Sequence, residues 1–261
     1  MVHTTSETTT VSPRHAGPPG CGNGGWVSGL LTERLDDLVP AEGDLTSATV
    51  RLSAPTPLGR PLQWEVDGSV ADGPDLSLHL LDGETLIGTA RRVPAPELTI
   101  PAPVTLEDAR AAAAGFDASN HPFPGCFVCG PDNDAGLHVY ASPVTGRDDV
   151  LAAPVTLTEE GLPSVLAALD CPGAFTVGFD EDPLLLGTFT STVHGPVPVG
   201  RELVVLAWAA GREGRKRWSG TALLDGERLL ASAAATWIAV GRDTIPGTAP
   251  SVPAAQPQET A

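Results

Sequence analysis

The feature of this sequence that most constrains its fold is an internal repeat. Residues 55–62 are PTPLGRPL and residues 196–203 are PVPVGREL, while residues 80–90 (LLDGETLIGTA) are matched by residues 223–233 (LLDGERLLASA). The matched blocks keep their order and nearly the same separation, which favours a duplicated unit over the recurrence of ordinary turn sequences. The second copy is therefore expected to repeat the fold of the first.

Each copy contains one predicted helix. Residues 25–39 carry apolar side chains at helical spacing with charged residues opposite, and residues 162–171 are apolar on nearly every side. Pro163 fits the first turn of the second helix, where its missing N–H has no cost. Pro172 and Gly173 are expected to end or kink that helix.

Four strands are predicted after each helix, because β-branched or alternating runs are separated there by Gly, Pro and Asp-Gly turns. They cover residues 46–54, 62–71, 75–82 and 84–93 in the first copy, and residues 184–194, 202–210, 216–225 and 228–240 in the second. The second copy has two more predicted strands before its helix, at 136–143 and 149–157. No comparable run precedes residue 25, so the first copy is expected to lack a strand or two.

The copies are flanked and joined by segments of different composition. The expected organisation is a mobile tail at 1–20, a first half at 21–93, a Pro-rich linker at 94–125, a second half at 126–240 and a mobile tail at 241–261. The linker includes a short predicted helix near 106–114, capped by Thr105.

Composition narrows the function classes. With 41% hydrophobic residues in 261, the chain can bury a sizeable core. Its 15 basic and 32 acidic residues give a net charge of −17, which disfavours nucleic acids and anionic membrane surfaces as partners. No apolar run is long enough to span a membrane, residues 1–25 show no secretory signal, and four cysteines are too few for a disulfide scaffold. A cytoplasmic globular protein is expected.

Several segments resemble one known fold family. Residues 121–140 (HPFPGCFVCGPDNDAGLHVY), 168–175 (ALDCPGAF) and 187–203 (GTFTSTVHGPVPVGREL) resemble segments of hotdog proteins similar to phenylacetate-type and 4-hydroxybenzoyl-CoA-type thioesterases. Residues 22–31 (GNGGWVSGLL) resemble the His-Gly-Gly or Asn-Gly-Gly start of the hotdog helix. The resemblance implies an α+β fold, a tandem (double) hotdog in which an antiparallel sheet wraps around central helices.

The resemblance also implies acyl-thioester chemistry without a cofactor. In these families the acyl chain lies in a cleft between two hotdog halves, and the substrate is an acyl-CoA or an acyl-carrier protein. Amides at one helix start polarise the thioester carbonyl, and a carboxylate from the partner half's helix activates water or attacks. Hotdog pairs commonly associate further, so a homodimer is expected.

Asp170 is the candidate catalytic carboxylate. The family's carboxylate position falls on Asp170 in the second helix and on Thr32 in the first. A carboxylate on an otherwise apolar helix is costly unless it is paired or used, and burial would raise its pKa toward a useful value. The alternative is that Asp170 caps a backbone amide of the turn at 171–173.

Asn23, with Gly24 and Gly25, is the candidate oxyanion-binding helix start. Free N–H groups at a helix start form a ready site for developing negative charge. The alternative is that Asn23 is an ordinary N-cap and that the glycines permit a tight entry. Residues 161–163 (GLP) depart from the family's His-Gly-Gly, so one complete site per chain is expected.

Four further residues are expected near the substrate. Trp26 follows the glycines of the first helix, and Thr32 would lie near the second, degenerate site. Gly173 follows the catalytic carboxylate, and His194 ends a strand that borders the pantetheine path in such folds.

Cys126 and Cys129 form a C-x-x-C pair with His121 nearby, which is ligand-like spacing for zinc. Only His138 could supply a fourth ligand, and a lone C-x-x-C is more often two buried small side chains, so no metal site is assigned. Cys171 was also considered as a nucleophile. Its apolar helix would raise the thiol pKa, which disfavours that role.

Two alternative functions remain open. A non-catalytic hotdog protein that binds an acyl chain would suit the loss of the second site. A hotdog hydratase or dehydratase would need an Asp-x-x-x-x-His pair, whereas the fifth residue after Asp170 is Phe175.

Overall fold

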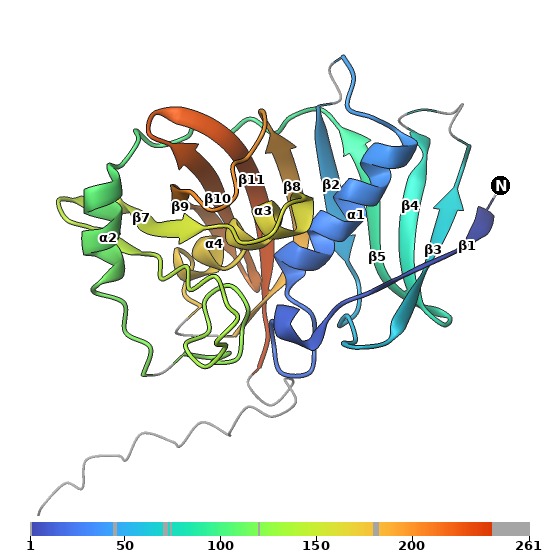
Figure 1. Cartoon of the computed structure of the whole chain (residues 1–261), viewed down its shortest axis with the longest axis horizontal. Helices are drawn as coiled ribbons and strands as arrows, with labels where there is room; N and C mark the ends of the chain where they lie inside the picture. The colour runs from blue at the N-terminus through green and yellow to red at the C-terminus, as the bar shows by residue number, and fades with distance from the viewer. Residues whose placement is uncertain are drawn as a thin grey trace, which may run out of the picture.

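The protein folds around one eleven-stranded antiparallel sheet (Figure 1). A computed structural model describes residues 2–43, 46–69, 73, 75–119, 121–179 and 183–241. Its helices are α1 (Gly24–Leu38), α2 (Leu106–Ala113), α3 (Leu162–Ala168) and α4 (Cys171–Phe175), with a 3-10 turn η1 (Pro13–His15). Its strands are β1 (Val2–Thr10), β2 (Ser47–Leu52), β3 (Pro61–Asp67), β4 (Ser77–Asp82), β5 (Thr85–Val93), β6 (Ser142–Val144), β7 (Arg147–Thr156), β8 (Leu184–Val193), β9 (Glu202–Glu213), β10 (Lys216–Asp225) and β11 (Arg228–Ala239).

The sheet repeats one topology twice. Its strand order is β1-β3-β4-β5-β2-β8-β11-β10-β9-β7-β6. Counted from β1 inward, the first half is β1-β3-β4-β5-β2, and counted from β7 inward, the second half is β7-β9-β10-β11-β8. The halves meet where β2 and β8 pair antiparallel, with Ser47 opposite Thr192 and Arg51 opposite Thr188. The duplication seen in the sequence is thus a duplication of topology.

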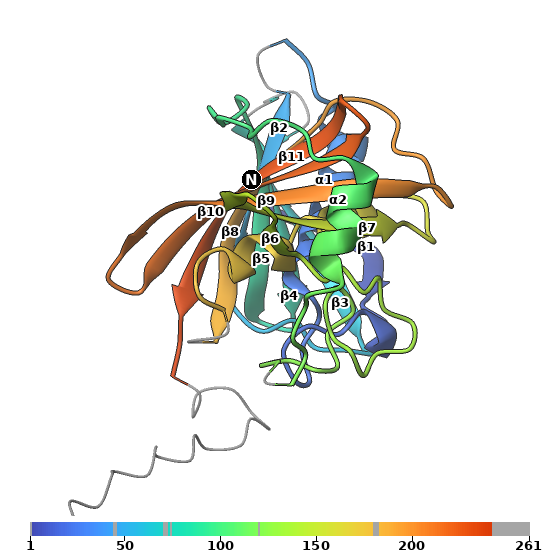
Figure 2. The same cartoon turned by 90° about the vertical axis from the view of Figure 1, so that its left-hand side faces the viewer.

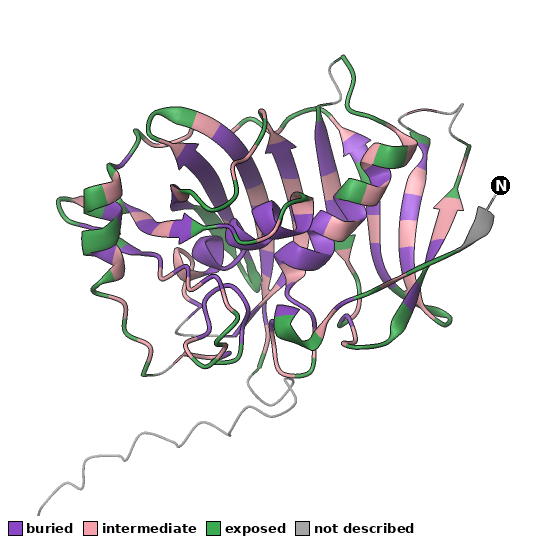
Figure 3. Ribbon diagram, in the orientation of Figure 1, coloured by how far each residue is buried: buried purple, intermediate pink, exposed green. Residues whose placement is uncertain are grey.

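Helices α1, α3 and α4 lie on one face of this sheet (Figure 1). The main core lies between them, and its largest fully buried side chains include Leu31, Leu35, Phe127, Phe189 and Leu166. Figure 3 shows α3 and α4 buried except at Leu162 and Phe175, which are half-buried, whereas α1 exposes one side toward its C-terminal end. The amphipathic pattern expected of residues 25–39 and the all-round apolar pattern of the second helix match these two environments.

The second helix is broken earlier than expected. The sequence predicts a continuous helix to Cys171, but α3 ends at Ala168 and α4 restarts at Cys171, with Asp170 at the break (φ −74°, ψ −83°). Pro172 explains the break, because it has no N–H for the Ala168 carbonyl and its ring would clash with that carbonyl. The break turns the Asp170 backbone out of helical geometry.

The N-terminal segment differs from the expected mobile tail. Residues 2–10 form β1, which pairs with β3 and completes the first half, and η1 follows it. Val11 is fully buried directly after the strand. The prediction was wrong because a Thr-rich edge strand needs only backbone pairing and few apolar side chains. The first half therefore begins near residue 2 rather than 21, and the C-terminal tail predicted from 241 lies beyond the described residues except for Gly241.

Helix α2 and the linker cover the opposite face of the second half (Figure 2). Ala109 and Ala112 pack into a second cluster with Val204, Leu206 and Trp208 of β9, while Leu203 and Val205 of the same strand face the main core. This alternation is that of a strand buried on both faces. The Thr105 hydroxyl accepts the Asp108 amide at 3.1 Å and starts α2 as expected. Within the described ranges, no helix has the length and apolar character that membrane crossing requires.

Candidate active site

Two glycines of α1 let its backbone approach α3 closely. A Cβ on Gly25 would lie 2.5 Å from the Asp170 Cβ and from the Leu166 carbonyl oxygen. A Cβ on Gly29, one turn later, would collide with the backbone of Pro163. The spacing of these glycines places both on the same side of the helix. The start of α1 in the first half is thus held against the helix break in the second.

Asp170 points across this contact. Its Oδ2 accepts the Gly25 backbone N–H at 2.8 Å and the Asn23 side-chain N–H at 2.7 Å. Asp170 does not cap α4 with its side chain, so the structural alternative considered for it does not hold. Its other oxygen, Oδ1, is buried without a hydrogen-bond partner among the described residues. A carboxylate with one anchored and one unengaged oxygen is suited to accept a proton.

Burial sets the protonation of Asp170. The residue is only 3% exposed, and desolvation raises the carboxyl pKa from 3.8 to about 7. The hydrogen bonds from Gly25 and Asn23 lower this pKa, whereas the nearby Cys126 raises it. Desolvation is the largest of these effects, so the carboxyl divides between its neutral and charged forms near neutral pH.

Asn23 is the N-cap of α1, the alternative considered for it, and it also contacts Asp170. Its Oδ1 accepts the Trp26 backbone N–H at 2.8 Å, as an N-cap does. Its Nδ2 then points away from the helix, toward Asp170 and toward the sulfur atoms of Cys126 (3.9 Å) and Cys171 (3.8 Å). The cap therefore fixes the direction of the amide that contacts the carboxylate.

A cavity of about 320 Å³ opens beside this group. That volume lies at the lower end of ligand pockets, and its walls are mostly apolar. Asn23, Gly24, Cys126, Asp170 and Cys171 contribute to its wall. Its apolar lining comes from both halves and includes Leu52, Phe123, Ala174, Phe179, Leu184, Leu186 and Trp237.

The structure brings together Asn23, Gly25 and Asp170 of the predicted site residues, with Gly24 at the cavity wall. Trp26, Thr32, Gly173 and His194 do not line this cavity, and their expected place beside the substrate stays a prediction. The Trp26 indole stacks on His15 with a centroid separation of 3.4 Å. Gly173 packs against Ser219 and Thr221 of β10, and the His194 ring pairs with the Ser232 hydroxyl at 3.1 Å.

The position in α1 that corresponds to Asp170 is Thr32, which carries a hydroxyl and no carboxylate. The Thr32 and Ser164 hydroxyl oxygens are buried there without partners among the described residues. At the start of α3, the Leu162 amide donates to the Glu33 side chain at 3.2 Å. The start of α3 therefore differs in its contacts from that of α1, as the departure from His-Gly-Gly at 161–163 indicates.

The residues with ligand-like spacing for zinc do not converge as the set that the sequence offers. His138 pairs through Nε2 with the Asn133 carbonyl at 2.9 Å, and the His121 Nδ1 accepts the Phe123 amide at 3.0 Å. The third group beside Cys126 and Cys129 is instead Cys171. The neighbouring thiols of Cys126 and Cys129, and then burial, raise the pKa of Cys171 well above its ordinary value, which agrees with the argument against a nucleophilic role.

Solved structures resemble the chain over nearly its whole length. A candidate thioesterase from Novosphingobium aromaticivorans has 16% identity and a TM-score of 0.63, covering 90% of this chain and 95% of its own. A protein of unknown function with the hot dog fold, from Alicyclobacillus acidocaldarius, has 14% identity and a TM-score of 0.60, covering 92% and 96%. This chain has the double hotdog fold.

One comparison bears on the alternative chemistry. The dehydratase domain of a mycocerosic acid synthase-like polyketide synthase has 14% identity and a TM-score of 0.62, covering 92% of this chain and 95% of its own. No protein-family model and no curated protein matches the sequence. Similar folds thus occur in thioesterase-like proteins and in dehydratases. The fold alone therefore does not decide which reaction this chain catalyses, and that question has to be argued from the site residues.

Sequence reasoning missed Gly29 and His15, and it did not foresee that Cys171 lies beside Cys126. Gly29 was signalled by its four-residue spacing from Gly25, which marks a close helix contact. Cys171 is adjacent to Asp170 but joins Cys126 only through the fold. His15 lies in the segment expected to be a tail, yet it is 5% exposed and stacks on the first turn of α1.

Proposed function

We propose that this protein hydrolyses acyl thioesters in the cavity beside Asp170. The observation that carries the proposal is the 2.8 Å hydrogen bond from the Gly25 amide to Asp170 across the two halves. It joins the positive end of a 15-residue helix to a buried carboxylate at the wall of an apolar cavity. Thioester hydrolysis needs these two elements, a base and a site for the developing oxyanion.

In this mechanism Asp170 acts as the base. Its Oδ1 takes a proton from a water molecule, and the hydroxide adds to the thioester carbonyl carbon. The oxygen that becomes negative faces the start of α1 at Gly24, which lines the cavity, because the Gly25 amide is held by Asp170. Collapse of this intermediate breaks the C–S bond, and Asp170 returns its proton to the leaving thiolate. The products are a carboxylic acid and a thiol, and no cofactor is consumed.

The cavity indicates the substrate class. Its apolar lining suits a hydrocarbon or aromatic acyl group, and its volume suits a group of modest size. Acyl-CoA and acyl-carrier protein present the same thioester and pantetheine arm, so both are included in the proposal. Association into a homodimer and a cytoplasmic location stay predictions from the sequence.

The test compares the wild-type protein with the Asp170→Asn variant on a panel of acyl-CoA thioesters. Hydrolysis is measured as the release of free CoA by chromatography. Loss of the base should lower kcat by at least about 100-fold, since general base catalysis contributes roughly 10²–10⁴-fold. Asp148→Asn is the matched control, because Asp148 is an exposed carboxylate on β7. Unchanged turnover in Asp170→Asn, with both variants folded by circular dichroism, would contradict the mechanism.

A specific observation favours the binding protein as second candidate. The Gly25 amide, which an oxyanion would need, is already paired with Asp170. If this pairing persists with ligand bound, the cavity would hold an acyl group without chemistry. Stabilisation by an acyl-CoA in a thermal unfolding assay, with no CoA released by the wild-type protein, would support binding over hydrolysis.

A further inference from the structure

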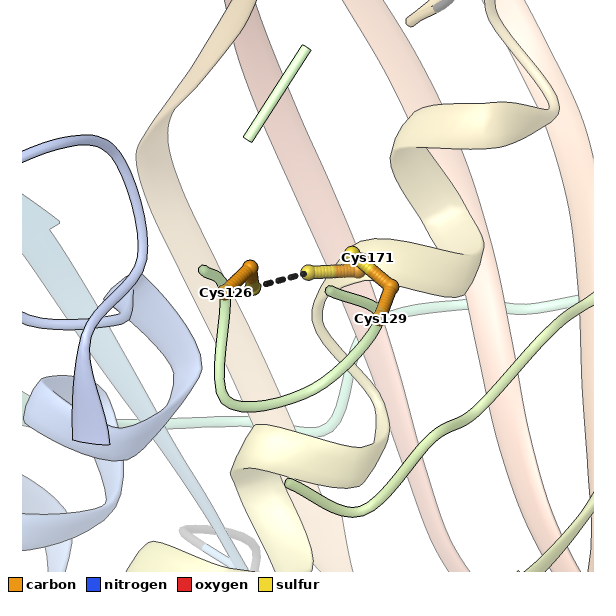
Figure 4. Close-up of side chains that lie close together, drawn as sticks. All are labelled: Cys126, Cys129 and Cys171. Atoms are coloured by element: carbon orange, nitrogen blue, oxygen red, sulfur yellow. Dashed lines mark hydrogen bonds between the residues drawn. The ribbon is translucent and has the colours of Figure 1, made fainter. Parts of the chain in front are cut away.

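Three cysteine side chains converge beside the candidate active site. Cys126 and Cys129 lie on one loop before β6, and Cys171 faces them from the start of α4 (Figure 4). Their sulfur atoms all lie within 4.8 Å of one another, and the Cys126 and Cys171 sulfurs are 3.6 Å apart. All three residues are buried, and none forms a disulfide. We refer to these residues as the three-cysteine cluster.

The loop around the cluster is shaped to hold sulfur. The Gly130 amide donates to the Cys126 carbonyl at 2.8 Å and closes the turn that carries Cys126 and Cys129. A Cβ on Gly130 would collide with the backbone of Pro124 and Cys126, so this turn requires glycine. The Asn23 side chain adds an N–H toward both Cys126 and Cys171. Such donors favour a thiolate over a thiol.

The spacing distinguishes between three explanations of the cluster. A disulfide would need two sulfurs about 2.05 Å apart and would leave the third unused. Neutral thiols packed as small hydrophobes would gain little from the N–H donors, because a thiol sulfur is a weak acceptor. A tetrahedral zinc ion with Zn–S bonds of about 2.3 Å holds its sulfurs about 3.8 Å apart, close to the separation of Cys126 and Cys171.

We infer that Cys126, Cys129 and Cys171 together bind a zinc ion as three thiolates. Binding releases one proton from each thiol to solvent. Soft thiolate ligands select zinc over magnesium or calcium. Cys126 and Cys171 also line the cavity, so the fourth position is left to water or a ligand from that side. This replaces the interpretation of Cys126 and Cys129 as two buried small side chains, and it does not depend on the proposed hydrolysis.

The site would tie together distant parts of the second half. Cys126 and Cys129 belong to the loop that precedes β6, and Cys171 follows the helix break at Asp170. A metal ion across these segments stabilises the fold because the unfolded chain offers no preformed site. It would also hold in place the cavity wall that carries Asp170.

The test measures zinc in the full-length protein, purified under reducing conditions without chelator, by inductively coupled plasma mass spectrometry. We expect about one zinc ion per chain in the wild type and less than about a tenth of that in Cys129→Ser and Cys171→Ser. Cys21→Ser is the matched control, since Cys21 is the chain's remaining cysteine and lies outside the cluster. It should keep the wild-type zinc content.

A second measurement covers variants that fail to fold. Chelator-treated wild-type protein is titrated with cobalt(II), and thiolate coordination is detected by its sulfur-to-cobalt charge-transfer absorption. Zinc added afterwards should abolish that absorption and raise the Tm. Folded, reduced wild-type protein that contains no zinc and gives no charge-transfer absorption would overturn the inference. Unchanged zinc content in Cys171→Ser, or a Cys126–Cys171 disulfide in protein isolated without oxidant, would overturn it as well.

Discussion

At the scale of single residues, Gly25 explains how a carboxylate can be buried at this interface. The space that its side chain would fill is occupied by the Asp170 Cβ and the Leu166 carbonyl. Its amide in turn donates to the carboxylate. The absence of a side chain at Gly25 thus leaves space for Asp170, and the Gly25 amide donates a hydrogen bond to its carboxylate. That bond matters because an unpaired buried charge is strongly destabilising.

Gly25→Ala is expected to destabilise the fold. The added methyl group lies 2.5 Å from two atoms of the second half, so α1 must shift away from α3. The free energy of unfolding, measured by urea titration, should fall by roughly 1–3 kcal/mol, as is typical of overpacked cores. Gly195→Ala is the control, because its Cβ would meet nothing within 4 Å, and it should stay within about 0.5 kcal/mol. Equal effects of both substitutions would contradict the close contact.

Sequence reasoning reached part of the site by two different routes. Asp170 and Asn23 were identified because the repeat and the family resemblance aligned the two helix starts. The three-cysteine cluster could not be predicted in the same way, because Cys171 lies far along the chain from Cys126. Cys171 begins α4 directly after the helix break, and the fold places it beside that loop. A local sequence pattern reports the spacing of residues within one element. The candidate site instead combines residues from three separate segments of the chain.

At the scale of elements, the linker helix α2 has a structural role that its composition did not indicate. It was predicted with its cap, but as part of a Pro-rich connection. In the structure its Ala109 and Ala112 cover Val204 and Leu206 on the far face of the sheet. A strand that is buried on both faces needs such a cover, since an exposed apolar sheet face would attract other chains.

The effect of a substitution in α2 on stability should therefore depend on which side of the helix carries it. Ala109→Asp places a carboxylate at a fully buried position and should lower the free energy of unfolding by about 3 kcal/mol. Ala111→Asp, on the exposed side of the same helix, should cost less than about 1 kcal/mol, mainly through helix propensity. Urea unfolding followed by circular dichroism measures both. A similar loss for the two variants would show that α2 is not a cover.

Strands with a clear local pattern were predicted well, whereas the strand expected at 136–143 was wrong, because only β6 (Ser142–Val144) forms there. The expected runs at 184–194, 216–225 and 228–240 agree with β8, β10 and β11 to within a residue at each end. Their apolar alternation and Asp-Gly turns define them locally. β1 was missed because its pairing with β3 comes from the backbone, which leaves no apolar pattern to detect.

At the scale of the whole molecule, the two halves are joined by polar as well as apolar contacts. Along the β2–β8 pair, the Thr49 and Thr190 hydroxyls lie 2.9 Å apart. His15 of the first half lies 3.4 Å from the Glu159 carboxylate of the second, and the Arg14 Nε donates to the same ring nitrogen at 2.9 Å. The histidine ring is buried between Trp26 and Phe127.

This histidine predicts a pH dependence of stability. Burial lowers the His15 pKa below 6.5, Arg14 lowers it further, and Glu159 opposes the shift without cancelling it. As the pH falls through 6.5, the unfolded chain therefore takes up a proton that the folded protein resists. The stability contributed by the neutral ring is present above pH 6.5 and is lost toward lower pH. In His15→Gln, the free energy of unfolding should fall less steeply between pH 7.5 and pH 5.5. Parallel pH profiles for the two proteins would exclude this role.

The β2–β8 pairing has a consequence for how such a molecule can change over generations. In an assembly of identical subunits, every substitution appears in both partners, so the two clefts must alter together. Here the β2–β8 pairing joins two halves of one polypeptide, so a substitution in one half leaves the sequence of the other half unchanged. In this chain Thr32 stands at the position that corresponds to Asp170, and Leu162 and Pro163 stand where the first helix has Gly24 and Gly25. One gene thereby encodes an asymmetric pair with a fixed one-to-one ratio.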